Sequence, residues 1–94
     1  MDPADIRISD VVVSTAGRDQ GEWFYVIDAD DTYLLLVNGK DRPLDKPKRK
    51  KRKHAQKVLR SETRVAAKLK SGDKVLNGEL RRDLAFLARE HASE

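Results

Sequence analysis

The 94-residue chain contains no cysteine, which excludes disulfide bonds, cysteine-based metal sites and thiol nucleophiles. Aromatic residues make up only 5% of it. Its apolar runs, among them residues 11–13, 23–27 and 34–37, are far shorter than the roughly 18 residues that a transmembrane helix needs. We therefore expect a soluble intracellular protein that has no membrane partner.

The length and composition also leave little room for catalysis. A chain of this size builds only a thin core, and neither His54 nor His91 belongs to a serine and carboxylate constellation typical of a catalytic triad. A glycine motif for nucleotide binding is absent. The aspartates within residues 28–31 lack the spacing of a cation loop and predict a turn instead. We predict a non-enzymatic protein with no cofactor, no metal ion and no small-molecule substrate.

Charge is distributed very unevenly along the chain. Residues 1–44 carry nine acidic and four basic side chains, residues 45–60 carry one acidic and nine basic side chains, and residues 61–94 are nearly balanced. Residues 45–57 also contain no leucine, isoleucine, valine or phenylalanine. The pattern predicts an apolar module, a basic connector without a core of its own and a second apolar module.

The first module has the pattern of short antiparallel strands, in which β-branched and aromatic runs alternate with turn signals. We predict three strands, at residues 11–13, 23–27 and 33–37, separated by a glycine-framed loop at 17–21 and a turn at 28–31. Asn38-Gly39 predicts a type I′ hairpin turn into an edge strand at residues 42–44. A last strand is expected around residues 51–56. So few strands predict an SH3-like barrel over residues 6–56.

The hydrophobic period changes to that of a helix from Leu59 onward. Val65, Ala66 and Leu69 fall on one helical face, and Gly72 is placed to end that helix. Asn77 predicts the N-cap of a second helix, whose apolar stripe comprises Leu80, Leu84, Leu87 and Ala88. The sequence therefore predicts an α+β fold: a barrel, a basic connector at residues 45–57 and a C-terminal two-helix appendage at residues 58–92.

Six consecutive basic residues, 48–53, form the strongest functional signal in the chain. Such a run repels itself unless an anion compensates it, and a polyphosphate backbone supplies that anion. If about six phosphates of single-stranded RNA are engaged, the slope of log K against log[salt] is near −4. Two other interpretations stay open, a solvated run without a specific role and a nuclear-import signal.

Two weaker signals lie in the strand region. Backbone N–H groups of residues 17–21, beside Arg18, can meet a phosphate, although an ordinary hairpin loop has the same composition. Because Trp23, Phe24 and Tyr25 are consecutive, a strand must point Phe24 away from the other two. An aromatic ring exposed in this way can stack on an unpaired base, although packing in the core is the more common outcome.

The string Val-Val-Val-Ser-Thr-Ala-Gly-Arg-Asp-Gln-Gly at residues 11–21 resembles the KOW motif. More widely, the chain resembles bacterial KOW-domain RNA-binding proteins related to the eukaryotic-type large-subunit ribosomal protein fourteen. The similarity covers most of residues 8–90 and includes Asp28, Asn38-Gly39, Arg42, Lys46-Pro47-Lys48, Lys53-His54 and residues 68–74 and 79–81. The resemblance implies an SH3-like barrel and a cytoplasmic, non-enzymatic protein that binds structured, ribosomal RNA. It assigns Gly21 as the KOW glycine and makes residues 14–21 a loop that faces RNA.

We therefore predict an accessory protein that docks on ribosomal RNA, alone or beside ribosomal proteins. Residues 46–57 would supply most of the affinity, and Arg18 with the loop backbone would set the position. The predicted RNA-binding residues are Ser14, Thr15, Gly17, Arg18, Gly21, Lys46, Lys48, Arg49, Lys50, Lys51, Arg52, Lys53, His54 and Lys57.

The alternative is a protein-interaction module that binds a ribosome or transcription factor through the barrel or the helical hairpin. In the second case, Leu80, Leu84 and Leu87 would form the docking face. A reader of duplex DNA is disfavoured because no predicted recognition helix carries the basic residues.

Overall fold

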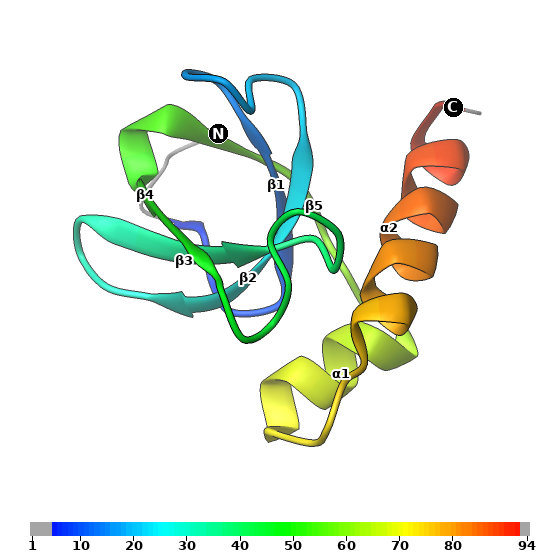
Figure 1. The fold of residues 1–94 in the computed structure, drawn as a ribbon. Helices are drawn as coiled ribbons and strands as arrows, with labels where there is room; N and C mark the ends of the chain where they lie inside the picture. The colour runs from blue at the N-terminus through cyan, green and yellow to red at the C-terminus, as the bar shows by residue number, and fades with distance from the viewer. Residues whose placement is uncertain (1–4, 93–94) are drawn as a thin grey trace.

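The computed structural model describes residues 5–92, which form one five-stranded antiparallel sheet and two helices. The predicted α+β class is thus confirmed. Figure 1 shows α2 standing beside the sheet, with α1 below it. The elements are β1 (Asp10–Ser14), β2 (Trp23–Ala29), β3 (Tyr33–Val37), β4 (Lys48–Lys51), η2 (Arg52–His54), β5 (Ala55–Arg60), α1 (Arg64–Ser71) and α2 (Asn77–Ala92).

The sheet curls because of the way its two edge strands are connected. The strand order is β4-β3-β2-β1-β5, so β4 and β5 lie at opposite edges. Only the three residues of η2 separate them along the chain. Such a short link forces the end of one edge strand to meet the start of the other. Figure 1 shows the resulting curvature, with η2 turning the chain from β4 into β5.

Both faces of this sheet are covered by apolar side chains. The inner face carries one buried cluster, built from Ile6, Val12, Phe24, Val26, Leu34, Leu36 and Ala55. The outer face shares a second cluster with the helices, built from Val11, Tyr25, Val37, Val65, Ala66, Val75, Leu80, Leu84 and Leu87. A strand buried on both faces needs a continuous apolar run rather than an alternating one. This explains the uninterrupted apolar runs at residues 11–13 and 34–37.

The three consecutive aromatics are divided between these two clusters. Phe24 points into the inner cluster, while Tyr25 is fully buried in the outer one. Trp23 is half-buried and packs against the outer cluster. The strand alternation predicted for these residues is confirmed, and the helices provide the cover that the sequence pattern of the strand alone did not reveal.

Tyr25 also joins the sheet to the helices through hydrogen bonds. Its hydroxyl donates a short hydrogen bond to the Asp83 carboxylate of α2 and lies 2.8 Å from the hydroxyl of Ser61. The Thr63 hydroxyl, at the N-cap of α1, donates to the same carboxylate at 2.8 Å. One carboxylate of α2 therefore joins β2 to the N-cap of α1. The sequence placed the boundary between the barrel and the helical appendage at residues 56–58. In the structure these residues lie inside β5, so the sheet continues past the expected boundary.

The predicted strands at residues 11–13, 23–27 and 33–37 are confirmed as β1, β2 and β3. The fourth strand was placed wrongly, because residues 42–44 form no strand and Lys48–Lys51 does. The basic connector is therefore a structural part of the sheet: residues 45–57 include β4, η2 and the start of β5. The basic strand β4 pairs with β3, which places Lys50 opposite Leu34 and Lys48 opposite Leu36. Both leucines belong to the inner apolar cluster.

The type I′ turn at Asn38-Gly39 was also predicted wrongly. Gly39 has a φ of +77°, but Asn38 does not have a positive φ. The backbone N–H groups of both residues donate to the carbonyl of Arg42, forming a wider loop. This loop packs closely on α2, since Arg81 donates to the Gly39 carbonyl at 2.7 Å and the Asn77 side chain accepts from Leu44 N–H at 2.8 Å.

The helices follow their predicted pattern with two corrections. Gly72 ends α1 in the left-handed conformation, as predicted. However, the Leu76 carbonyl accepts the first hydrogen bond of α2, so the Asn77 side chain is free to bind the loop and does not cap the helix. Ala88 is exposed, because the sheet covers only the face that carries the three leucines of the stripe.

The leucine face proposed as a docking site for a protein partner is not available. Leu80 is fully buried, and Leu84 and Leu87 are at least nine-tenths buried in the outer cluster. The alternative function therefore loses the helical surface on which it depended.

Candidate nucleic-acid interface

The loop between β1 and β2 lies against η2. Its first residue, Thr15, donates its backbone N–H to the His54 carbonyl at 2.9 Å. At its other end, Gly21 N–H donates to the Ser14 carbonyl at 2.8 Å, with a φ of +91° that favours glycine. These backbone bonds bring the β1–β2 loop and the last part of the basic run to the same end of the sheet.

Asp19, within this loop, neutralises part of the basic run. Its carboxylate lies 2.6 Å from the ammonium of Lys48 and 3.0 Å from that of Lys50, and it accepts a hydrogen bond from the Ser14 hydroxyl at 2.7 Å. Lys50 also donates to the Ala16 carbonyl at 2.9 Å, and its side chain is only 7% exposed. Two of the six consecutive bases are therefore compensated by an acidic residue of the protein itself.

The geometry also stabilises the charged form of Asp19. Burial raises the pKa of this carboxyl, but hydrogen bonds from the two lysines and from Ser14 outweigh that effect and hold the pKa well below its usual range. Asp19 therefore stays ionised at neutral pH, and the loop is attached to the inner side of β4 by charge.

A second lysine–aspartate pair lies at the opposite end of β1. The Lys57 ammonium is 3.2 Å from the Asp10 carboxylate and 3.3 Å from that of Asp5. The side chains of Lys57 and Asp10 are 5% and 1% exposed. The inner apolar cluster is thus bounded by one buried ion pair near each end of β1. Lys57, predicted from sequence as an RNA contact, is buried in this pair.

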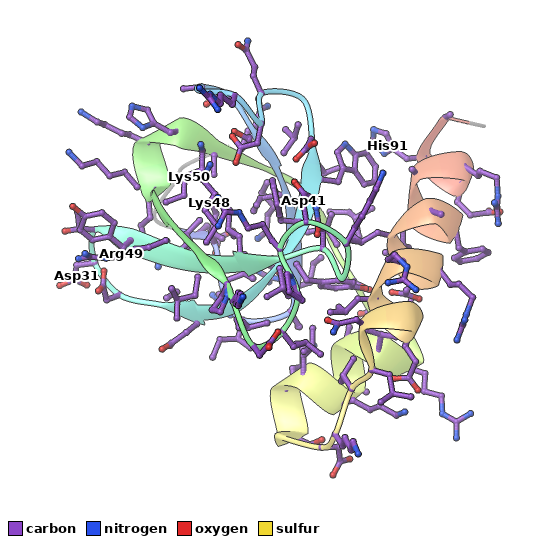
Figure 2. All side chains as sticks on the ribbon, viewed as in Figure 1. Asp31, Asp41, Lys48, Arg49, Lys50 and His91 are labelled. Carbon is purple, nitrogen blue, oxygen red and sulfur yellow. The ribbon has the colours of Figure 1, made fainter. Side chains whose placement is uncertain are left out.

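Alternation along β4 separates the remaining bases. Figure 2 shows Arg49 on the opposite side of β4 from Lys48 and Lys50, near Asp31. The Arg49 guanidinium lies 3.7 Å from the centre of the Tyr33 ring, in a cation–π contact. Arg52 donates to the carbonyls of Asp30 and Ile6, at 2.6 and 3.1 Å. These two arginines therefore fasten β4 and η2 to their neighbours.

Three exposed bases lie around the junction of the loop, β4 and η2, and we call them the basic surface: Arg18, Lys51 and Lys53. Among residues 5–92, none of the three has an ion-pair partner. His54 is half-buried beside them, and Thr15 and Gly17 are exposed in the loop. Lys46 is exposed too, but it lies in the separate loop before β4.

A cleft of about 300 Å³ opens between the β1–β2 and β3–β4 loops. Arg18, Arg42 and Lys48 line it together with the acidic Asp19, Glu22 and Asp41. The charges of this cleft nearly balance, so it does not extend the basic surface. No group of histidine and acidic side chains within residues 5–92 is arranged to hold a metal ion.

The role of Asp19 was not predicted from the sequence. The lysines were expected to be exposed, because the carboxylate that compensates Lys50 is about 30 positions away in the chain. An aspartate inside a loop otherwise expected to bind phosphate is the signal that could have revealed it, since a carboxylate there would oppose the ligand unless it were already paired.

A scan against protein-family models finds no match to this chain, and a search of curated proteins also finds none. Within the described part of the chain, neither helix combines the length and apolar character that crossing a membrane requires.

Proposed function

We propose that this protein is a non-enzymatic RNA-binding protein, whose curled sheet is an SH3-like barrel of the KOW type. In this proposal it docks on ribosomal RNA as an accessory protein in the cytoplasm. The basic surface carries the proposal: Arg18, Lys51 and Lys53 are exposed on three adjoining elements, while the neighbouring Lys48 and Lys50 are compensated within the protein.

The arrangement is suited to a phosphate backbone. Arg18, Lys51 and Lys53 come from a loop, a strand and a 3₁₀ turn, and backbone bonds hold these elements in fixed relative positions. A rigid array of cations binds phosphates with a smaller loss of conformational entropy than a flexible basic tail would. Because Lys48 and Lys50 are already paired, we expect fewer phosphate contacts than the six suggested by the sequence.

The proposal predicts that RNA affinity depends on where the bases lie and not only on net charge. The test variant replaces Arg18, Lys51 and Lys53 with glutamine. The matched control replaces Arg64, Lys70 and Lys74 with glutamine and so removes the same charge. These three residues are exposed on α1 and in the loop after it. Affinity for ribosomal RNA is measured by filter binding at near-physiological KCl.

We expect the test variant to bind at least tenfold more weakly than the control variant. Equal losses of RNA affinity in the two variants would show that only net charge matters, and would contradict a defined interface. No detectable complex between the unmodified protein and ribosomal RNA would refute the proposed function. Circular dichroism of both variants verifies that the fold is unchanged.

A further inference from the structure

A second cleft, of about 450 Å³, lies on the outer face of the sheet beside the C-terminal end of α2. Its volume is within the range of about 300–1,000 Å³ that is usual for small-ligand sites. Val13, Trp23, Gln56, Val58 and His91 are among the residues that line it. The apolar core does not fill this cleft, and the proposed phosphate contacts do not use it.

The floor of the cleft is a row across three strands. Val13 of β1 pairs with Trp23 of β2 on one side and with Gln56 of β5 on the other. The row thus places an indole ring, an apolar side chain and an amide next to each other. An indole ring offers a flat surface for stacking, and an amide can both donate and accept hydrogen bonds.

His91 forms the wall on the side of the helix. Its ring centre lies 5.4 Å from that of Trp23, with the ring planes inclined by 72°. Figure 2 shows His91 at the end of α2, on the side that faces the sheet. The two rings therefore meet at a steep angle and are not stacked flat on each other.

The residues of the cleft are close along the chain to those of the basic surface. Val13 is followed directly by Ser14 and the β1–β2 loop, and Gln56 is two residues after His54 of η2. Among residues 5–92, no acidic side chain lines this cleft. In contrast, Glu79 and Asp83 line the cleft between α1 and α2, and acidic residues also line the one beside Arg18.

We propose that this cleft binds one unpaired base of the RNA, stacked on Trp23, with the Gln56 amide at the hydrogen-bonding edge of the base. The inference rests on the proposed function, because the phosphates of the same strand would lie on the basic surface. It adds to that function a preference for RNA with an unpaired base over fully paired RNA.

Trp23 is the single tryptophan of the chain, so its fluorescence reports on this cleft without any mutation. The full-length protein is titrated with a ten-nucleotide oligoadenylate, with a fully paired RNA duplex and with inorganic polyphosphate, which has charge but no bases. Binding is followed by the anisotropy of labelled RNA, and the cleft by tryptophan emission and its quenching by acrylamide.

We expect the oligoadenylate to change the emission of Trp23 and to protect it from acrylamide, whereas the duplex and the polyphosphate leave both unchanged. Trp23→Leu keeps an apolar side chain but removes the flat ring. It should weaken oligoadenylate binding about 5- to 150-fold, the usual effect of losing one stacked base. Gln56→Ala, at an exposed position, should weaken it several-fold without changing duplex binding.

The outcomes separate the two proposals. If the oligoadenylate binds by anisotropy but Trp23 emission and acrylamide quenching do not change, the base site is refuted and the RNA-binding function stands. An equal emission change with polyphosphate would also overturn the base site, because it would show an indirect effect of charge. If neither RNA binds, both proposals fail.

Discussion

Removal of the Asp19 carboxylate should destabilise the protein mainly by leaving the buried Lys50 ammonium without a compensating negative charge, with only its hydrogen bond to the Ala16 carbonyl. Lys50 is 7% exposed and lies 3.0 Å from this carboxylate, whereas Lys48 is more exposed and can turn its ammonium toward water. Breaking a buried ion pair by removing one partner costs about 3–5 kcal/mol. We take the lower limit, about 3 kcal/mol, for Asp19→Ala, because the site is near the surface.

Such a loss is a large part of the free energy of unfolding of a small domain, which is about 5–15 kcal/mol. For a chain of this length, 1 kcal/mol corresponds to about 4–8 °C in Tm, so Asp19→Ala should melt about 12–24 °C below the unmodified protein. Thermal and urea unfolding followed by circular dichroism measure the change. Asp31→Ala, an exposed acid in the β2–β3 turn, is the matched control and should change stability by less than about 0.5 kcal/mol.

A second variant tests the cause. In Asp19→Ala/Lys50→Met the stranded charge is gone and a side chain of similar length fills its space, so much of the lost stability should return. If Asp19→Ala melts within a few degrees of the unmodified protein, the carboxylate does not hold the loop as described. If adding Lys50→Met lowers stability further, the unpaired ammonium is not the source of the loss.

The same carboxylate predicts the direction of the pH dependence. Because the pKa of Asp19 is lower in the folded than in the unfolded protein, its contribution to stability is fully present above the unfolded pKa of about 3.9. That contribution is lost as the pH falls through the folded pKa. The stability difference between the unmodified protein and Asp19→Asn should therefore be largest near neutral pH and shrink below about pH 4. A difference that grows on acidification would contradict the ion-pair interpretation.

Three further results are expected. Tyr25→Phe leaves the Asp83 carboxylate without its tyrosine donor and should lower the free energy of unfolding by about 1–3 kcal/mol in urea titrations. Gly39→Ala should lower the free energy of unfolding by at least about 2 kcal/mol, because the φ of Gly39 is +77° and an added Cβ would overlap the Asn77 carbonyl oxygen. Gly21→Ala should lower it by less, because Gly21 also has a positive φ but has open space around it. RNA binding through the three cations of the basic surface should give a slope of log K against log[KCl] near −2, roughly a 20-fold loss of affinity from 50 to 200 mM. A slope near −4 would mean that about three bases outside the basic surface also contact phosphate.

The location of the first three strands and of both helices could be predicted because local chemistry determines them. Residues 11–13, 23–27 and 33–37 are rich in β-branched and aromatic side chains, and the leucines of α2 recur at helical spacing. The fourth strand could not be predicted in this way, because Lys48–Lys51 has no apolar alternation of its own. It becomes a strand by pairing with β3 and by neutralising two lysines with a distant aspartate.

The candidate site shows the same division. The sequence alone determined that a block of positive charge occupies residues 48–53 and that a glycine-framed loop occupies residues 17–21. It could not distinguish the exposed Lys51 and Lys53 from Lys50 and Lys57, which are buried against aspartates. All four are lysines in one short segment, and their difference comes from which carboxylates lie within reach after folding. The free energy of a charged group depends on its partners and on its exposure to water, and only the tertiary structure decides both.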